Sequence, residues 1–130
     1  MTTSHRPAPH APSPTEIRLA KSKDSLSVAF PNEAFSFTAE FLRVNSPSAE
    51  VQGHGYGEKK LIPGKKNVTI TAIEPVGHYA IRLTFSDGHS TGIYTWDYFA
   101  EMGEKQFDVW AEYTQALKKN NLSREAGEKA

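Results

Sequence analysis

The chain has 130 residues, a length that suits one domain with an ordinary hydrophobic core. Its 15 Lys and Arg residues balance its 15 Asp and Glu residues, so the chain lacks the basic excess that is typical of proteins that bind DNA or RNA. The absence of cysteine excludes disulfides, thiolate catalysis, thiolate zinc sites and iron–sulfur ligation by this chain alone.

Both ends of the chain have compositions that bury little. Residues 1–14 are rich in proline and have no large hydrophobic residue after Met1, so we predict a disordered arm there. We predict a single domain over residues 15–119 and a frayed tail over residues 120–130. No stretch is long and apolar enough for a membrane span or a secretory signal, which favours a cytoplasmic location.

The first part of the domain shows strand periodicity. Hydrophobic residues alternate with polar or small ones over 17–19, 26–30 and 35–37. Turn-forming residues separate these segments, so we predict three strands in an antiparallel meander.

A short helical region follows the meander. Residues 39–44 predict about one helical turn, and Ser46 with Pro47 resembles a helix start that Gly53 would end. The three glycines within residues 53–60 predict a flexible or partner-binding loop.

The next segment predicts a second group of strands. Residues 67–73 and 79–85 have the strongest strand patterns, and residues 75–78 are predicted to turn the chain between them. The dipeptide Asp87-Gly88 predicts a tight hairpin that leads into a strand over residues 92–94.

The C-terminal third is rich in aromatic residues at helical spacing. Thr95 or Asp97 is predicted to cap a helix that begins near Trp96, and a second, longer helix is predicted to bury Phe107, Trp110, Ala111, Thr114 and Leu117 on one face. Most of the aromatic residues are expected in the core, with the hydroxyls of Tyr56, Tyr94 and Tyr98 available to line a groove. The predicted fold class is α+β, with a small, mainly antiparallel sheet, short helices and a C-terminal helix packed on the sheet.

Three histidines outside the N-terminal arm are candidates for chemistry. His54, His78 and His89 all lie in predicted turns or loops, where together they could hold a divalent metal ion. Their spacing does not force them together, and the ordinary alternative is a solvated loop histidine.

A second group of polar residues surrounds the predicted helix start. Arg43, Ser46, Ser48 and Glu50 suit hydrogen-bonded recognition, although helix capping and surface charge explain the same residue types. A serine-hydrolase interpretation requires the fold to bring His54 or His89 to Ser48.

Several motifs together resemble a known family. They are LRV (42–44), SPSAEV (46–51), GHG (53–55), EPVGHYA (74–80) and FSDGHSTGIYTWDY (85–98). Over about residues 15–118 the chain resembles stand-alone bacterial DUF971 proteins, which are related to the N-terminal domain of gamma-butyrobetaine hydroxylase. The resemblance implies a small, mainly antiparallel sheet flanked by short helices.

The resemblance also has implications for metal binding. The hydroxylase domain holds a structural zinc with three cysteines and one histidine, and only the histidine has a counterpart here, His89. The cysteine segment corresponds to residues 45–51, where Ser46, Ser48 and Glu50 or Val51 stand instead, and a serine hydroxyl is a far weaker zinc ligand than a thiolate. The oxygenase chemistry belongs to a separate domain of that enzyme, so the resemblance does not imply a hydroxylase.

Three functions remain open. The leading prediction is a non-enzymatic binding or adaptor domain for a partner protein or small ligand, with a polar site built from Arg43, Ser46, Ser48, Glu50, His54, Asp87, His89 and Tyr94. The second is a metal-binding accessory protein for zinc or iron, related to iron–sulfur handling, with His89 and His54 as ligands and Glu50 or Asp87 completing the set. The third is a small hydrolase or isomerase that uses His54 or His89 as a base with Glu50.

Overall fold

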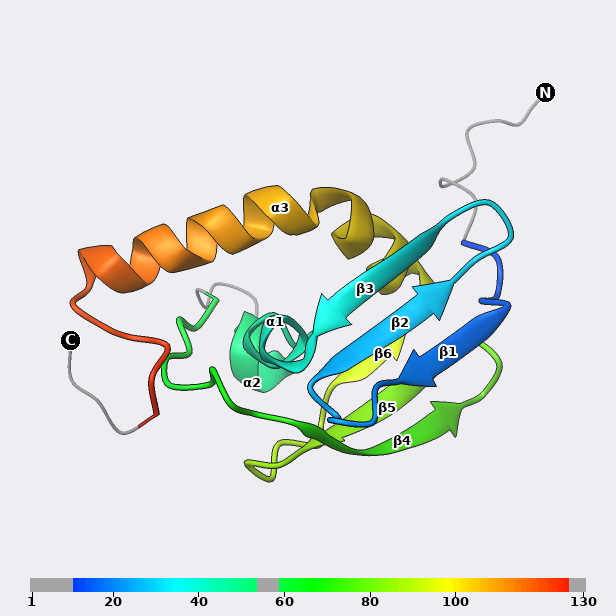
Figure 1. Ribbon diagram of the computed structural model, residues 1–130, viewed down its shortest axis with the longest axis horizontal. Helices are drawn as coiled ribbons and strands as arrows, with labels where there is room; N and C mark the ends of the chain where they lie inside the picture. The colour runs from blue at the N-terminus through cyan, green and yellow to red at the C-terminus, as the bar shows by residue number, and fades with distance from the viewer. Residues whose placement is uncertain (1–10, 54–58, 127–130) are drawn as a thin grey trace.

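The computed structural model describes residues 11–53 and 59–126. Its strands form two three-stranded antiparallel sheets, one drawn in front of the other in Figure 1, with a long helix along their upper side. The predicted α+β class is confirmed, but the strands divide into two sheets rather than the single sheet expected. Residues 1–10 and 127–130, and the Gly-rich segment 54–58 with His54 and Tyr56, lie outside the described residues.

The first sheet is the predicted meander. Strands β1 (Glu16–Leu19), β2 (Ser25–Ala29) and β3 (Ala34–Thr38) pair in chain order, with Ile17 opposite Val28 and Val28 opposite Phe35. The alternation seen in the sequence buries Leu26, Val28 and Phe37, because successive side chains of a strand point to opposite faces.

Two short helices lead from the first sheet to the second. In α1 (Ala39–Val44) the hydroxyl of Thr38 accepts a hydrogen bond from the backbone N–H of Phe41 and caps the helix. The second helix, α2 (Ala49–Gln52), ends at Gly53 as predicted. Its N-cap residue is Ser48 rather than the expected Ser46, whose hydroxyl instead accepts a hydrogen bond from the N–H of Ser48.

The second sheet pairs β4 (Ile70–Val76), β5 (Ala80–Phe85) and β6 (Ile93–Thr95). Strand β4 lies about three residues later than predicted and includes Pro75, which was expected in the turn. Proline is tolerated there because β4 is an edge strand, whose outer N–H groups are not needed for the sheet.

The C-terminal region forms one helix, α3 (Trp96–Lys119), where the sequence predicted two. The hydroxyl of Thr95 caps it by accepting a hydrogen bond from the N–H of Tyr98. Gly103 lies within this continuous helix, and the ring of Phe35 occupies the space that a side chain at this position would fill. The glycine is therefore explained by close packing of the helix on β3.

The hydrophobic core lies between the two sheets and α3. Phe37 of the first sheet, Leu83 of the second and Phe99 of α3 are all buried in one cluster. Phe107 was predicted to belong to this core but is 85% exposed, because the sheets cover a different face of α3.

Residues 120–126, which are part of the segment predicted to fray, fold back onto the domain. The backbone carbonyls of Ser123 and Arg124 accept hydrogen bonds from the N–H groups of Gly64 and Lys66. The guanidinium of Arg124 forms a two-point ion pair with the carboxylate of Glu40, at 2.7 and 2.8 Å. Glu40 is only 4% exposed, so this ion pair supplies the partner that a buried carboxylate needs.

A substitution at Gly103 tests the packing of α3 on β3. We expect Gly103→Ala to lower the free energy of unfolding by about 1–3 kcal/mol, because the added methyl group overlaps the Phe35 ring. In a Phe35→Ala background the same change should be neutral or stabilising by up to ~1 kcal/mol, since alanine favours a helix. Urea denaturation of the four variants measures both values, and an equal loss in the two backgrounds would contradict the explanation.

Candidate functional site

The predicted polar residues gather where α1 and α2 meet the hairpin between β5 and β6. Asp87 lies at the tip of this hairpin, where its carboxylate contacts the guanidinium Nε of Arg43 and the ammonium of Lys65, both at 2.7 Å. The second carboxylate oxygen of Asp87 accepts a hydrogen bond from the N–H of His89 at 3.0 Å. The carboxylate thus joins three separate parts of the chain.

These contacts determine the charge of Asp87. Partial burial opposes ionisation, but the bonds from Lys65, the His89 amide and Arg43 outweigh it and lower the pKa of Asp87 to about 2. Asp87 is therefore a carboxylate throughout the physiological range. Arg43 keeps a second nitrogen, Nη1, buried and bonded to none of the described residues.

His89 forms the centre of a second set of contacts. Its Nε2 lies 3.0 Å from the hydroxyl of Ser46 and 3.5 Å from that of Ser48. Its Nδ1 lies 3.5 Å from the carboxylate of Glu50, which also accepts a hydrogen bond of 2.6 Å from the hydroxyl of Thr91. Burial and the nearby charge of Arg43 lower the pKa of His89, so the neutral imidazole is favoured at neutral pH.

Tyr94 lies beneath this network rather than in a groove. Its side chain is fully buried, and its hydroxyl donates a hydrogen bond of 2.7 Å to the backbone carbonyl of Leu42. The hydroxyl of Tyr98 likewise points inward, to the carbonyl of Asn45 at 2.9 Å. The prediction of outward hydroxyls was wrong for both residues, because buried tyrosines need a hydrogen-bond partner within the protein.

The structure brings together most of the predicted site and adds two residues to it. The connected members are Arg43, Ser46, Ser48, Glu50, Asp87 and His89. Lys65 and Thr91 complete the network, and sequence reasoning missed both because each carries only an ordinary polar side chain in a loop. His54 lies outside the described residues.

The order Ser46, His89, Glu50 has the outline of a nucleophile, a base and an orienting acid. However, Ser46 has 0% exposed surface, and a methyl group on the adjacent Gly92 would lie 2.5 Å from its hydroxyl. A nucleophile must reach its substrate, so this buried hydroxyl is suited to holding the hairpin on α2 rather than to attack.

The described residues do not fit the zinc centre that the family resemblance implied. Nε2 of His89 faces two neutral hydroxyls, and the carboxylate of Glu50 lies on the opposite ring nitrogen. His78 is at the other end of β5, about 20 Å of strand away. Within residues 11–53 and 59–126, no three His, Asp or Glu residues are grouped closely enough to hold an ion.

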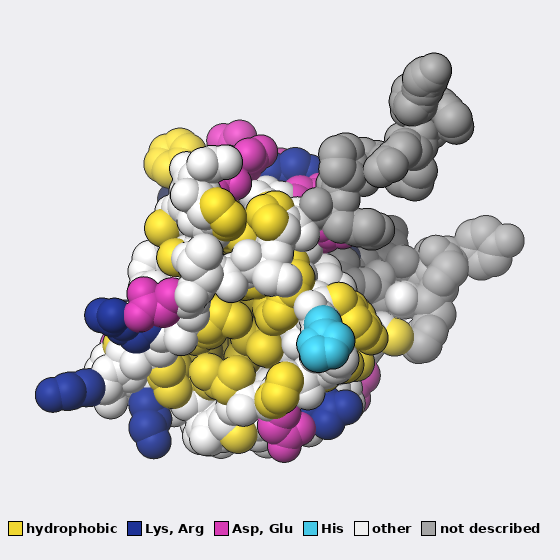
Figure 2. All heavy atoms as spheres, turned by 90° about the vertical axis from the view of Figure 1, so that its right-hand side faces the viewer, with side chains coloured by type: hydrophobic (Ala, Val, Ile, Leu, Met, Phe, Trp, Pro, Cys, Tyr) yellow, Lys and Arg dark blue, Asp and Glu magenta, His cyan; other side chains and the backbone are white. Residues whose placement is uncertain are grey.

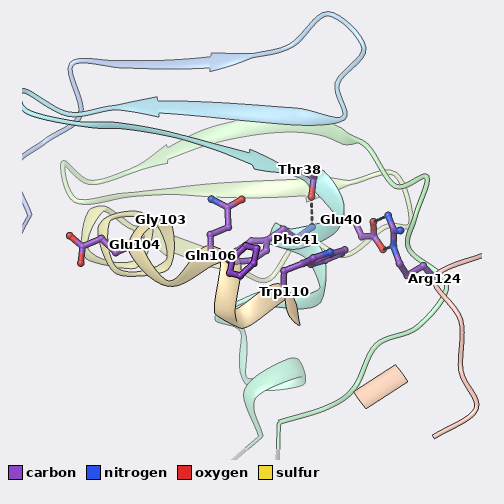
Figure 3. Close-up of a pocket in the computed structure, with 9 residues that line it drawn as sticks. Thr38, Glu40, Phe41, Gly103, Glu104, Gln106, Trp110 and Arg124 are labelled. Carbon is purple, nitrogen blue, oxygen red and sulfur yellow. Dashed lines mark hydrogen bonds and ion pairs between the residues drawn. The ribbon is translucent and has the colours of Figure 1, made fainter. Parts of the chain in front are cut away.

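A separate groove lies between α1 and α3, on the side of the molecule where the chain returns after α3. It has a volume of about 570 Å³, within the usual range for binding sites. Figure 3 shows Phe41 and Trp110 side by side, with the Glu40–Arg124 ion pair at one end. We call it the α1–α3 groove; its lining comprises Thr38, Glu40, Phe41, Gly103, Glu104, Gln106, Phe107, Trp110 and Arg124.

A smaller hollow of about 350 Å³ lies beside the start of α3. Ala11, Tyr79 and Trp96 line it, and the indole N–H of Trp96 donates a hydrogen bond to the carbonyl of His78.

Hydrophobic side chains also gather in the middle of the molecular face at the right of Figure 1, as Figure 2 shows. No helix among the described residues is long and apolar enough to cross a membrane.

Comparison with known proteins places the chain in a family. The model described as "Gamma-butyrobetaine hydroxylase-like, N-terminal" matches residues 17–100. The chain belongs to this family. That membership confirms the resemblance drawn from the hairpin and the α1–α2 motifs. No match is found among the curated proteins.

Solved structures support the same assignment to the gamma-butyrobetaine hydroxylase-like family. Two NMR solution structures are 42% and 39% identical, with TM-scores of 0.78 and 0.76; they cover 90% and 100% of this chain and 93% and 96% of their own. A crystal structure from Acidithiobacillus ferrooxidans is 36% identical with a TM-score of 0.58, covering 70% of this chain and 92% of its own. It is described as a DUF971 protein of unknown function.

The ion pairs of Asp87 predict a pH-dependent contribution to stability. Because the pKa is about 2 in the folded protein and 3.8 ordinarily, this contribution is complete above pH 3.8 and is lost as the pH falls toward 2. We expect Asp87→Asn to cost about 1–2 kcal/mol at neutral pH, after allowance for solvent screening, and progressively less in acid.

Urea denaturation over a pH series checks this expectation. The matched control is Glu74→Gln, which removes an exposed ion pair with Arg82 and should change stability by less than ~0.5 kcal/mol. A loss for Asp87→Asn that stays constant from neutral pH into acid would show that the charge is not its cause.

Proposed function

We propose that the chain is a non-enzymatic protein-binding module and that its binding surface is the α1–α3 groove. One observation carries the proposal: Phe107 is 85% exposed beside a 570 Å³ groove that contains two further aromatic rings. A large aromatic side chain that is exposed to water does not gain the free energy of burial that stabilises core residues. Exposed aromatic residues of this kind are frequent anchors of protein interfaces.

The composition of the groove supports a protein as the partner. Phe41 and Trp110 form an apolar surface, with ring centres 6.3 Å apart. Thr38, Glu104 and Gln106 place polar groups around them. An apolar centre with a polar rim is the usual arrangement of a protein-binding patch.

The polar site around His89 supports a role without catalysis. The hydroxyls of Ser46 and Ser48 are buried, and the charges of the site are used in contacts between α1, the loop before β4 and the hairpin. These contacts fix the C-terminal end of α1, and α1 is the helix that carries Phe41 in the groove. The polar network therefore acts, in this proposal, as the rigid support of the binding surface.

Site-specific photo-cross-linking tests the module. A photoreactive phenylalanine analogue in place of Phe107 should form covalent adducts with a partner protein in cells, because this position projects beside the groove. The analogue in place of Tyr79, which is 56% exposed and lies outside the groove, is the matched control. The products are identified by mass spectrometry.

The outcome depends on the position of the cross-linker. Adducts at position 107 that are absent at position 79 support the proposal. No adduct at position 107, or the same products at both positions, would overturn it. Because Phe107 is exposed, its replacement should change the free energy of unfolding by no more than ~0.5 kcal/mol, so loss of folding does not confuse the result.

A metal-binding accessory protein for zinc or iron is the competing proposal, with His89 and His54 as its remaining ligand candidates. Binding there would require the hydroxyls of Ser46 and Ser48 to give up their contacts with Nε2 of His89. Under the module proposal, we expect tag-free protein purified without chelator to carry no stoichiometric zinc or iron by elemental analysis. One metal ion per chain, lost in a His89→Ala variant, would support the accessory role instead.

A further inference from the structure

We infer that the occupant of the α1–α3 groove is a second copy of this chain, with Phe107 of each copy inserted in the groove of the other. In this arrangement the two α3 helices pack antiparallel about a two-fold axis that passes close to Phe107. The inference rests on the proposed function and names its partner.

One surface patch carries both a projecting ring and a hollow. Phe107 is itself one of the residues that line the groove, next to Trp110. A two-fold interface uses the same patch on both subunits, so it requires a surface that is complementary to itself. A projecting ring beside an aromatic hollow meets that requirement, whereas a different partner would have to supply its own hollow for Phe107.

The charges of the groove favour an apolar occupant. The carboxylate of Glu40 is already neutralised by Arg124, through hydrogen bonds of 2.7 and 2.8 Å. The guanidinium of Arg124 in turn lies 5.3 Å from the centre of the Trp110 ring. With these groups satisfied by each other, an incoming phenylalanine ring gains contact with Phe41 and Trp110 without leaving a buried charge unpaired.

The position of Phe107 in α3 suits a two-fold axis. It lies at the middle of a helix that runs from Trp96 to Lys119. Two antiparallel helices that cross at their midpoints overlap along their full length, which is about 36 Å for 24 residues at 1.5 Å each. A crossing at either end would leave most of the helix without a partner.

The charges along the exposed face of α3 are complementary in the antiparallel direction. At 100° per residue, the charged residues within about 60° of Phe107 are Glu104 and Lys118. Their charges are opposite, and they lie on opposite sides of Phe107. About an axis at Phe107, an antiparallel copy places Lys118 across from the first turn of the other helix, which contains Asp97. A parallel copy would instead set Lys118 beside Lys118 and Glu104 beside Glu104.

The limited size of this surface predicts a weak dimer. One helix and the adjoining groove form an interface at the small end of the range for specific complexes. We therefore expect a dimer whose fraction rises with protein concentration and falls with added salt, since part of the attraction is between surface charges.

Sedimentation velocity of the full chain measures this association. We expect Phe107→Ala to raise the dissociation constant about tenfold or more, as for an aromatic anchor at an interface centre. Lys118→Glu should weaken the dimer by a smaller factor. Tyr79→Ala, which removes an exposed ring outside the groove, should leave the dissociation constant unchanged.

Spin labels test the direction of the helices, and the absence of native cysteine makes single labels simple to introduce. About an axis at Phe107, copies of residue 111 would lie about 12 Å apart along the helix direction and copies of residue 119 about 36 Å apart. Pulsed electron paramagnetic resonance should thus give a short distance between the two spin labels of the Ala111→Cys dimer. It should give a long distance between those of the Lys119→Cys dimer. A parallel pair would give similar distances at both positions.

The results separate this inference from the proposed function. A wild-type chain that stays monomeric at all concentrations, a dimer unaffected by Phe107→Ala, or similar distances at both labels would overturn the inference. If the chain is monomeric while position 107 cross-links to a different protein, the inference falls and the binding module stands. If neither a dimer nor a cross-link forms, both fall.

Discussion

The rest of the structure depends on the burial of Tyr94 at the junction of the second sheet, α1 and α3. Its ring packs against Phe99 and Tyr98 of α3, with ring centres 6.0 and 5.1 Å away, and its hydroxyl satisfies the carbonyl of Leu42 in α1. Burying a hydroxyl or a carbonyl group without a hydrogen-bond partner costs free energy. The hydrogen bond between these two groups therefore fixes the distance between the second sheet and α1. Gly92 permits the approach, because a side chain there would meet Tyr94 and Ser46.

On this junction the chain builds two surfaces of different chemistry. At the C-terminal end of α1, Asp87 forms ion pairs with Arg43 and Lys65. The imidazole of His89 contacts two hydroxyls and a carboxylate. The His89 site is the place where the resemblance to the gamma-butyrobetaine hydroxylase domain implied a metal. In this chain, hydrogen bonds and ion pairs connect α2 to the hairpin at that site. The α1–α3 groove instead presents aromatic rings around a neutralised ion pair. The first joins separate parts of the chain, and the second is the surface that we propose for binding.

Local patterns in the sequence predicted the elements better than their contacts. The alternation in residues 17–37 and the dipeptide Asp87-Gly88 depend on neighbouring residues and appear in the structure as predicted. Of the two predicted caps of α3, Thr95 and Asp97, the structure has Thr95. The polar site was predicted in part, because motif-rich loops identified Arg43, Asp87 and His89 but not Lys65 or Thr91. Errors arose where residues far apart in the chain are in contact. The face of α3 that packs on Phe35 includes Gly103 and leaves Phe107 exposed, and the carbonyl of Leu42 accepts a hydrogen bond from the Tyr94 hydroxyl.

The sequence by itself determined the α+β class, the family, the two groups of strands and the lack of thiol ligands, since composition and short-range periodicity carry that information. Only the tertiary structure decided which polar residues meet, which aromatic rings are buried and where a groove opens. Helical spacing shows that Phe107 and Trp110 lie near one another, but it does not show which face the sheets cover. That choice is made by packing between residues far apart in the chain, and it leaves Phe107 in solvent while Phe99 is buried.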